Sequence, residues 1–380
     1  MTSDELQSKT IRWLRFPLAI AVVFAHDFAR GEVYAHLSTI DWLNLSISDT
    51  YNIIRELLSD IIARGARPCF FIFSGFLFFN NIGKWSKQTY FDKIKRRFFT
   101  LIIPYILWNI IPILVKGFFL LKQFDGSLTI WLNELWENGI LKIFWNYHDW
   151  TGVSKNIFGI LIPYYYPCNY PLWFIRDLII LAFLAPLIFY FIKYTKFAGV
   201  IALGICFITQ IWLTIPGFSI DAVFFYSIGA YFSINGKNMI KELQTGWIIW
   251  LIIAVIAMFF SLFLTGSKVF FFRTIFVAFG SITFINIVSL LLERGRISAD
   301  SAAVSFLSKT SFFIFAAHSV CLLSWAILLV NTVIQSNNTF LLIVKYLLAP
   351  FVCVIFCITV FYIMKKITPK LLNLITGSRL

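Results

Sequence analysis

A histidine and an arginine stand eleven residues apart in the first apolar run of the chain, with Arg15 at its start and His26 well inside it. In a helix the two groups are about 16 Å apart along the axis, roughly half of the hydrocarbon core of a bilayer. Ionisable groups at that depth are costly and usually mark a function. A neutral imidazole can accept a proton near neutral pH, whereas a guanidinium suits an anion. The structural alternative is an arginine that anchors the helix and a histidine that packs against a carbonyl group.

Further polar groups accompany later apolar runs. Counted from the ends of the runs, six residues lie in the outer half of the membrane: Arg64, Arg67, Trp173, Arg176, Asp177 and Arg273. Arg176 and Asp177 point about 100° apart, so we expect each to pair with another helix, in a cavity or as a structural ion pair. By the same count His318 lies about 10 Å from the cytoplasmic edge, so we do not expect it to contact His26. On its spacing alone, His318 is more typical of a structural histidine.

Cations gather at the opposite membrane edge. Lys95, Arg96 and Arg97 precede the third apolar run, and Arg15 opens the first. Such a cluster attracts anionic lipid headgroups. It would equally suit a soluble donor that is rich in phosphate, such as an acyl-coenzyme A.

The composition excludes a soluble domain. Of 380 residues, 59% are hydrophobic and only 13% are charged, about half of the charged fraction of soluble proteins. The net charge of +14 lies in short loops between apolar runs, which indicates membrane orientation and no nucleic-acid partner. The six cysteines show neither a disulfide framework nor metal-binding spacing, so we expect no metal site and no bound cofactor.

The apolar runs predict an all-α, polytopic membrane protein in one domain, residues 1–380. Ten spans can be drawn, each long enough to cross about 30 Å: 13–30, 67–82, 98–121, 172–194, 197–214, 218–235, 246–265, 270–292, 311–331 and 340–364. The basic loops alternate, which places both termini in the cytoplasm. Two long loops, 31–66 and 122–171, then lie outside. The second is rich in Trp and Tyr, which suit either the headgroup layer or stacking on sugars.

Five stretches in order resemble the integral-membrane acyltransferase family 3. They are Arg15 with ten residues before His26, FFIFSGFLF (70–78, with Ser74), KIKRRFFTLIIPYILWN (93–109), PLWFIRDL (171–178) and FFIFAAH (312–318). The resemblance covers residues 10–365 and is closest to bacterial stand-alone members, without a fused extracytoplasmic domain. One departure is Thr100, three residues after Arg97, where many relatives have a second arginine.

The resemblance implies an O-acyltransferase, of the acetyl type first, in a bacterial inner membrane. It implies His26 as catalytic base, and Arg15 and the basic segment as the binding site of an acyl-coenzyme A co-substrate. The acceptor would be an envelope glycan or lipid-linked sugar. Two alternatives remain: a transporter or flippase with a relay through His26, Arg176 and Asp177, and a non-catalytic partner in polysaccharide export. The absence of a visible internal repeat counts against the transporter.

Overall fold

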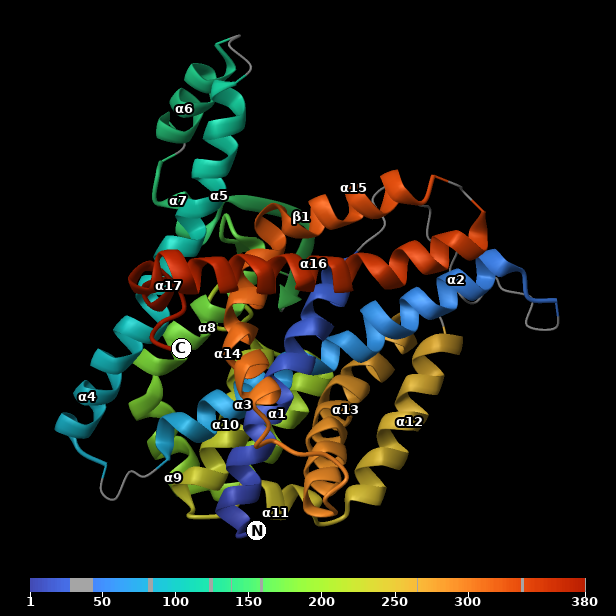
Figure 1. The fold of residues 1–380 in the computed structure, drawn as a ribbon. Helices are drawn as coiled ribbons and strands as arrows, with labels where there is room; N and C mark the ends of the chain where they lie inside the picture. Colours follow the sequence, from blue (N-terminus) through green and yellow to red (C-terminus); the bar gives the residue numbers. More distant parts are fainter. Residues whose placement is uncertain are drawn as a thin grey trace.

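The computed structural model describes residues 1–27, 44–80, 85–122, 126–137, 139–157, 160–264, 266–335 and 338–379. Within these, helices dominate and the one sheet is a hairpin (Figure 1). The helices in chain order are α1 Ser3–His26, α2 Ile47–Arg55, α3 Ala66–Phe79, α4 Lys87–Arg97, α5 Ile103–Leu121, α6 Ser127–Glu137, α7 Lys142–Trp145, α8 Trp173–Phe183, α9 Ala185–Thr209, α10 Ile220–Ile234, α11 Met239–Gln244, α12 Trp247–Phe263, α13 Ser267–Glu293, α14 Ala302–Ala317, α15 Leu323–Val333, α16 Thr339–Ile367 and α17 Pro369–Ile375. Short π and 3-10 segments join several of them: η2 Glu56–Ile62, η3 Ala63–Gly65, η4 Phe98–Ile102, η5 Tyr170–Leu172 and η6 His318–Leu322.

The prediction of an all-α polytopic membrane protein is confirmed. Six helical segments in the described chain are long and apolar enough to cross a membrane, and α10 and α12 are shorter apolar helices. The two other predicted spans correspond to α1 and to α8 with the start of α9. The predicted break between residues 194 and 197 is also confirmed, because Lys196 has non-helical angles (φ 53°, ψ −130°) inside α9.

The two long loops that we predict to lie outside are more ordered than predicted. Residues 47–65 are helical and run directly into α3. The charged residues in this segment argue against a membrane span, but they are paired. Arg64 forms an ion pair with Asp60 at 2.7 Å, and Glu56 forms one with Arg273. Residues 31–43 of the first loop lie outside the described residues, as do 28–30 and 81–82 at the ends of two predicted spans.

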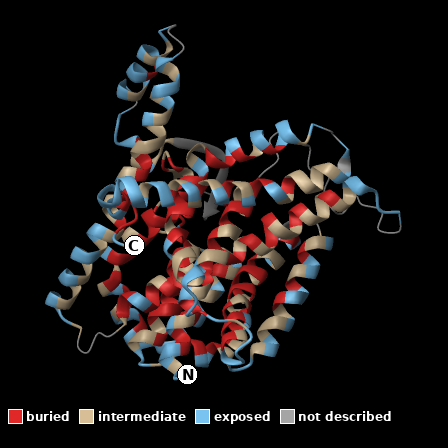
Figure 2. Cartoon of the chain, in the orientation of Figure 1, coloured by how far each residue is buried: buried red, intermediate tan, exposed pale blue. Residues whose placement is uncertain are grey.

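The second outer loop, 122–171, contains α6, α7 and an antiparallel hairpin of β1 His148–Ile157 and β2 Ile160–Tyr166. The hairpin is a small departure from the all-α prediction. In Figure 1, α5 and α6 project together from the body of the protein, and Figure 2 shows that this projection is mostly exposed. The buried residues are concentrated where α1, α3, α10 and α14 meet.

Two glycines set the closest helix contact in the body. A Cβ on Gly75 of α3 would lie 2.0 Å from the carbonyl oxygen of Tyr226, and a Cβ on Gly229 of α10 would lie 1.9 Å from that of Ile72. No side chain fits at such distances, so both positions must be glycine for α3 and α10 to pack backbone to backbone.

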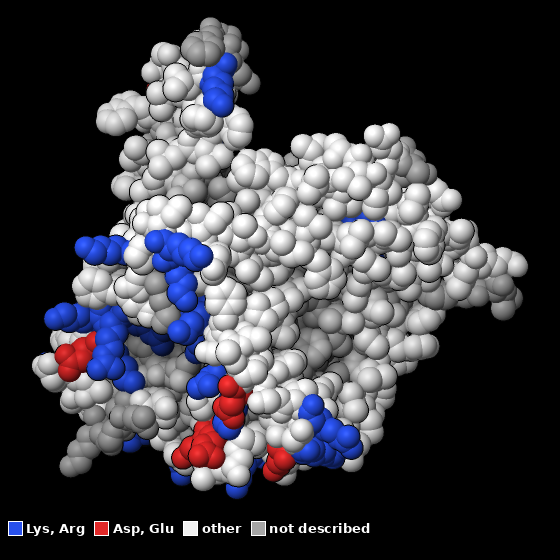
Figure 3. All heavy atoms as spheres, viewed as in Figure 1, with Lys and Arg blue, Asp and Glu red and all other residues white. Residues whose placement is uncertain are grey.

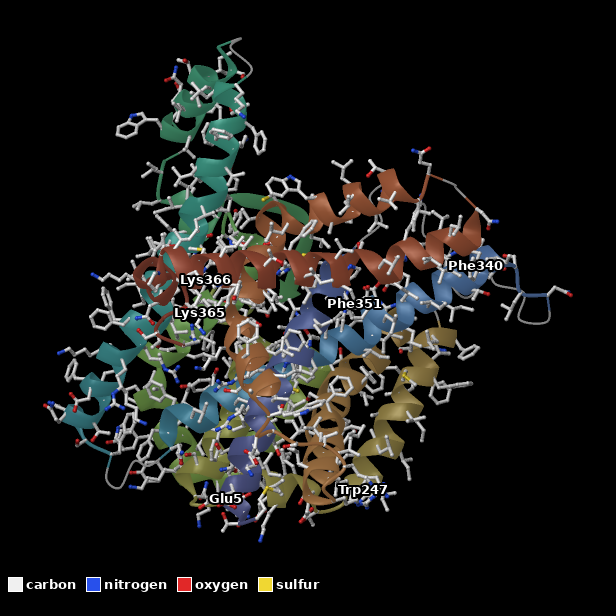
Figure 4. All side chains as sticks on the ribbon, viewed as in Figure 1. Glu5, Trp247, Phe340, Phe351, Lys365 and Lys366 are labelled. Atoms are coloured by element: carbon white, nitrogen blue, oxygen red, sulfur yellow. The ribbon has the colours of Figure 1, made fainter. Side chains whose placement is uncertain are left out.

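The surface charge is one-sided. In Figure 3, Lys and Arg gather around α4, α17 and the N-terminus, whereas the visible surface over α15 and over most of α16 is almost uncharged. Figure 4 shows the same polarity within α16, whose Lys365 and Lys366 lie at the end opposite Phe340. This distribution supports the predicted orientation, with the N-terminus and the basic face in the cytoplasm.

Candidate active site

His26 and His318 are in contact. His26 is the last residue of α1, and His318 opens the π-helical turn η6 directly after α14, which packs along α1. Nε2 of His318 lies 3.4 Å from Nδ1 of His26, and the ring centroids are 5.0 Å apart. The prediction that they do not touch is wrong. The prediction measured the depth of His318 from residue 311, but α14 begins at Ala302. The nine additional helical residues place His318 about 14 Å further from the start of the helix, at the level of His26.

Backbone carbonyl groups fix the proton positions of this pair. Nδ1 of His26 lies 2.8 Å from the carbonyl oxygen of Val22, and Nδ1 of His318 lies 3.0 Å from that of Ile314. A carbonyl oxygen only accepts, so each neutral ring carries its proton on Nδ1. Nε2 of His318 is then an acceptor that faces the Nδ1–H of His26. Nε2 of His26 keeps a lone pair, and this ring is only partly buried whereas His318 is fully buried.

A buried asparagine positions an aromatic side chain beside the two histidines. Asn169 donates from Nδ2 to the carbonyl oxygen of Ala316 at 2.9 Å, and its Oδ1 accepts from Ser319 Oγ at 2.7 Å. The following Tyr170 meets the His26 ring edge to face, with centroids 5.8 Å apart. The stretch 169–170 therefore ties the outer hairpin to the start of η6. Asn169 was not predicted, because a lone amide in a loop carries no sequence pattern.

Trp173 lies one turn further along the same segment, and an arginine side chain packs over its ring. The guanidinium carbon of Arg67 is 5.4 Å from the centre of the Trp173 ring. Arg67, at the start of α3, therefore accompanies the predicted Trp173 on the aromatic side of the site. Arg64, the possible substrate contact predicted beside it, is bound to Asp60 and lines neither of the two cavities described below.

A cationic cavity of about 280 Å³ lies nearer the N-terminus, between α1, α3, α8 and α14. Arg15 and Arg97 line it, as predicted for donor-binding residues, together with Ser74. Lys309 and Arg379 also line it and were not predicted. The described lining residues include no carboxylate, which leaves a positively charged space between helices.

A second, more polar cavity of about 440 Å³ adjoins the first. The two share Ile11, Arg15 and Leu77, so Arg15 stands between them. The second cavity also takes Arg12 and Asn80 into its lining. Two adjoining hollows around one arginine suit an elongated ligand better than a single ion.

Only one of the three cations predicted before the third span contributes to this lining. Lys95 and Arg96 are exposed on α4 and line neither cavity, whereas Arg97 faces the first. The three sit on successive positions of a helix, so they point in different directions. Ser308 and Ser311 are polar residues on one face of α14 and also line the cavity. Their spacing beside Lys309 was the sequence signal that could have indicated a polar cavity there. For Arg379, in the segment after the last span, we find no such signal.

Phenyl rings separate the cationic cavity from the histidines. Phe70, Phe174 and Phe315 line the cavity, with ring centroids 6.0 Å apart for Phe70 and Phe174 and 5.7 Å for Phe174 and Phe315. His318 is one turn beyond Phe315 along the chain. The cavity therefore ends at packed phenyl rings, one helical turn from His318.

Arg176 and Asp177 are buried and form hydrogen bonds with other segments of the chain. Nη1 of Arg176 donates to the carbonyl oxygens of Trp145 at 3.1 Å and Tyr165 at 2.9 Å, and Oδ2 of Asp177 accepts from Ser219 at 2.7 Å. Each residue therefore has the separate partners that we expected. They also form an ion pair with each other, which we did not expect, because Nε of Arg176 lies 3.6 Å from Oδ1 of Asp177. The long arginine side chain folds back across the 100° between the two positions. Neither residue lines a described cavity.

Comparisons with known proteins identify the family of this chain. A family model described as an acyltransferase domain matches residues 9–366. The succinoglycan biosynthesis protein ExoH of Rhizobium meliloti (strain 1021) is 22% identical over 397 residues, which cover 99% of this chain and 94% of that protein. No solved structure matches. The prediction of an enzyme is thus confirmed over the transporter and the non-catalytic partner. The chain belongs to the integral-membrane acyltransferase family 3 and is a multi-pass membrane acyltransferase.

Proposed function

We propose that this acyltransferase moves an acyl group, acetyl in the first instance, from a cytoplasmic acyl-coenzyme A to a hydroxyl group of a cell-envelope glycan. The observation that carries the proposal lies on α1. Arg15 lines a cationic cavity, and His26 lies eleven residues further along the same helix. Nδ1 of His26 is bound to the Val22 carbonyl oxygen, which leaves the lone pair of Nε2 for a substrate. One helix thus links an anion-binding end with a base.

The glycan acceptor is inferred from chemistry and from a relative. ExoH is named for succinoglycan biosynthesis, and we extend a saccharide acceptor to this chain. Tyr170 beside His26 and the pair formed by Trp173 and Arg67 offer ring faces and a cation on the outer side, which suit a sugar hydroxyl brought to His26. The acceptor then lies in or beyond the outer leaflet of a bacterial inner membrane.

The positive charge of the cavity supports acyl-coenzyme A as the donor. Acyl-coenzyme A carries phosphate groups, and guanidinium groups bind phosphate with paired, charge-assisted hydrogen bonds. Among the described residues, no carboxylate forms an ion pair with Arg15 or Arg97. The thioester arm would reach from this cavity past Phe174 and Phe315 to the histidines.

The proposed reaction needs one base and conserves its proton. Nε2 of His26 takes the proton of the acceptor hydroxyl while the hydroxyl oxygen attacks the thioester carbonyl carbon. The tetrahedral intermediate collapses, its carbon–sulfur bond breaks, and the departing sulfur takes the proton back from Nε2. The positive charge that His26 carries in between is stabilised by the Val22 carbonyl oxygen and by Nε2 of His318, both of which face its Nδ1–H.

Sealed inside-out membrane vesicles with radiolabelled acetyl-coenzyme A test the proposal. We expect label in the glycan fraction, released by mild base because the new bond is an ester. Membranes that lack the protein are the control. Hydrolysis to free acetate without labelled glycan, or unlabelled glycan with intact donor, would contradict the proposal.

A further inference from the structure

The segment after the last span returns to the bundle. Helix α17 follows α16 and buries Leu372 and Ile375 against the core. The carbonyl oxygen of Ile375 accepts a hydrogen bond of 2.9 Å from Nε1 of Trp108 in α5. Thr376, at the end of α17, is fully buried. These contacts hold residues 369–376 in a defined place beside α5.

A glycine turn then aims the chain at the cationic cavity. Gly377 has φ +62°, and the N–H of Ser378 bonds back to the carbonyl oxygen of Asn373 at 2.9 Å, which is the closing pattern of a Schellman motif. A Cβ at Gly377 would lie 2.6 Å from the carbonyl oxygen of Thr100. Both the angle and the close approach require glycine here. The turn therefore holds Gly377 against Thr100, and both Thr100 and Arg379, two residues further on, line the cavity.

Arg379 enters the cavity in a held conformation. Its Nη1 donates to the carbonyl oxygen of Thr376 at 2.8 Å, and its guanidinium carbon lies 4.1 Å from the centre of the Phe312 ring. Burial, and then the nearby charges of Arg97 and Arg15, lower the pKa of Arg379. Bringing three guanidinium groups together is unfavourable unless an anion joins them. No described carboxylate forms an ion pair with any of the three.

We propose that Arg379 is a donor-binding residue, whose guanidinium acts with Arg15 and Arg97 to bind the phosphate groups of the acyl donor. This inference rests on the proposed function. An anionic lipid headgroup offers the same phosphate chemistry. The soluble donor is favoured because the cavity lies between α1, α3, α8 and α14 and adjoins the second polar cavity at Arg15.

Coenzyme A binding to the full-length protein tests the inference. The protein is placed in nanodiscs of phosphatidylcholine, which removes anionic lipid, and titrated calorimetrically with coenzyme A. Arg379→Ala should bind about tenfold more weakly or worse, the loss expected for one charge-assisted hydrogen bond. Arg379→Lys should recover part of that loss because it keeps the charge. Lys370→Ala removes a cation from the same segment at an exposed position and should bind like wild type.

A second variant separates position from charge. Gly377→Val keeps Arg379 but strains the turn, and it should weaken coenzyme A binding in the same direction. In the acetyl-transfer assay, Arg379→Ala should raise the donor KM while kcat and the acceptor KM change by less than about twofold. Equal coenzyme A affinity in wild type and Arg379→Ala would overturn the inference and leave the proposed function standing. A wild-type protein that binds no coenzyme A would overturn both.

Discussion

Replacing His318 should slow acyl transfer without weakening donor binding. The residue is fully buried and its Nε2 lies 3.4 Å from Nδ1 of His26, so it touches the proposed base and not the cationic cavity. A hydrogen bond to a charged group contributes about 1.5–3 kcal/mol, and at 3.4 Å we take the lower part, about 1.5–2 kcal/mol. Since about 1.4 kcal/mol is tenfold in rate, His318→Leu should lose roughly 10- to 30-fold in kcat.

The choice of variants makes this prediction specific. Leucine fills similar space without an acceptor, so packing is largely kept, whereas His318→Gln can place Oε1 near the position of Nε2 and should recover part of the rate. The assay is acetyl transfer at saturating donor and acceptor, with coenzyme A affinity and thermal unfolding measured on the same preparations. A His318→Leu enzyme with the kcat of wild type would refute the positioning role. A glutamine variant no faster than the leucine variant would refute the acceptor role of Nε2.

Three further predictions concern the donor end, the helix contact and the topology. Arg15→Ala should raise the donor KM at least about tenfold and leave the acceptor KM unchanged, because it removes a guanidinium from both cavities; unchanged donor kinetics would remove Arg15 from the site. Gly75→Ala should abolish or strongly reduce folded protein in membranes, whereas Gly117→Ala, whose added carbon meets only ordinary contacts from 3.5 Å, should accumulate normally; equal levels of the two would contradict the close packing of α3 and α10. Reporter fusions within residues 122–171 should report an outer location, and a cytoplasmic signal would refute the orientation.

Hydropathy and charge predicted the membrane architecture because both are properties of single segments. The break at Lys196 and the basic loops needed no knowledge of tertiary contacts. The same reasoning failed at residues 47–65, where ion pairs such as Arg64 with Asp60 neutralise charges that look unsuited to a helix in this position. A capping box at Ser46 and Asp49 marks the start of this helix and was the local signal available.

The site was predicted in its parts but not in its connections. Arg15, Arg97 and Ser74 were named and line one cavity, because the first-span spacing and the resemblance both point to them. The contact of His318 with His26 depends on where α14 begins, and apolarity alone does not show this, because Ser308 and Lys309 lie inside the helix. Contacts between segments far apart in sequence leave no local pattern.

The central claim is that His26 is the base, and one measurement tests it most directly. A single turnover is followed by rapid quench, with donor bound to wild-type or His26→Ala protein in nanodiscs and acceptor added at saturation. We predict that the alanine variant binds coenzyme A like wild type but transfers the acyl group at least ~10²-fold more slowly, the low end of what a positioned base supplies. A wild-type rate in the variant, or a loss explained entirely by weaker donor binding, would contradict the account.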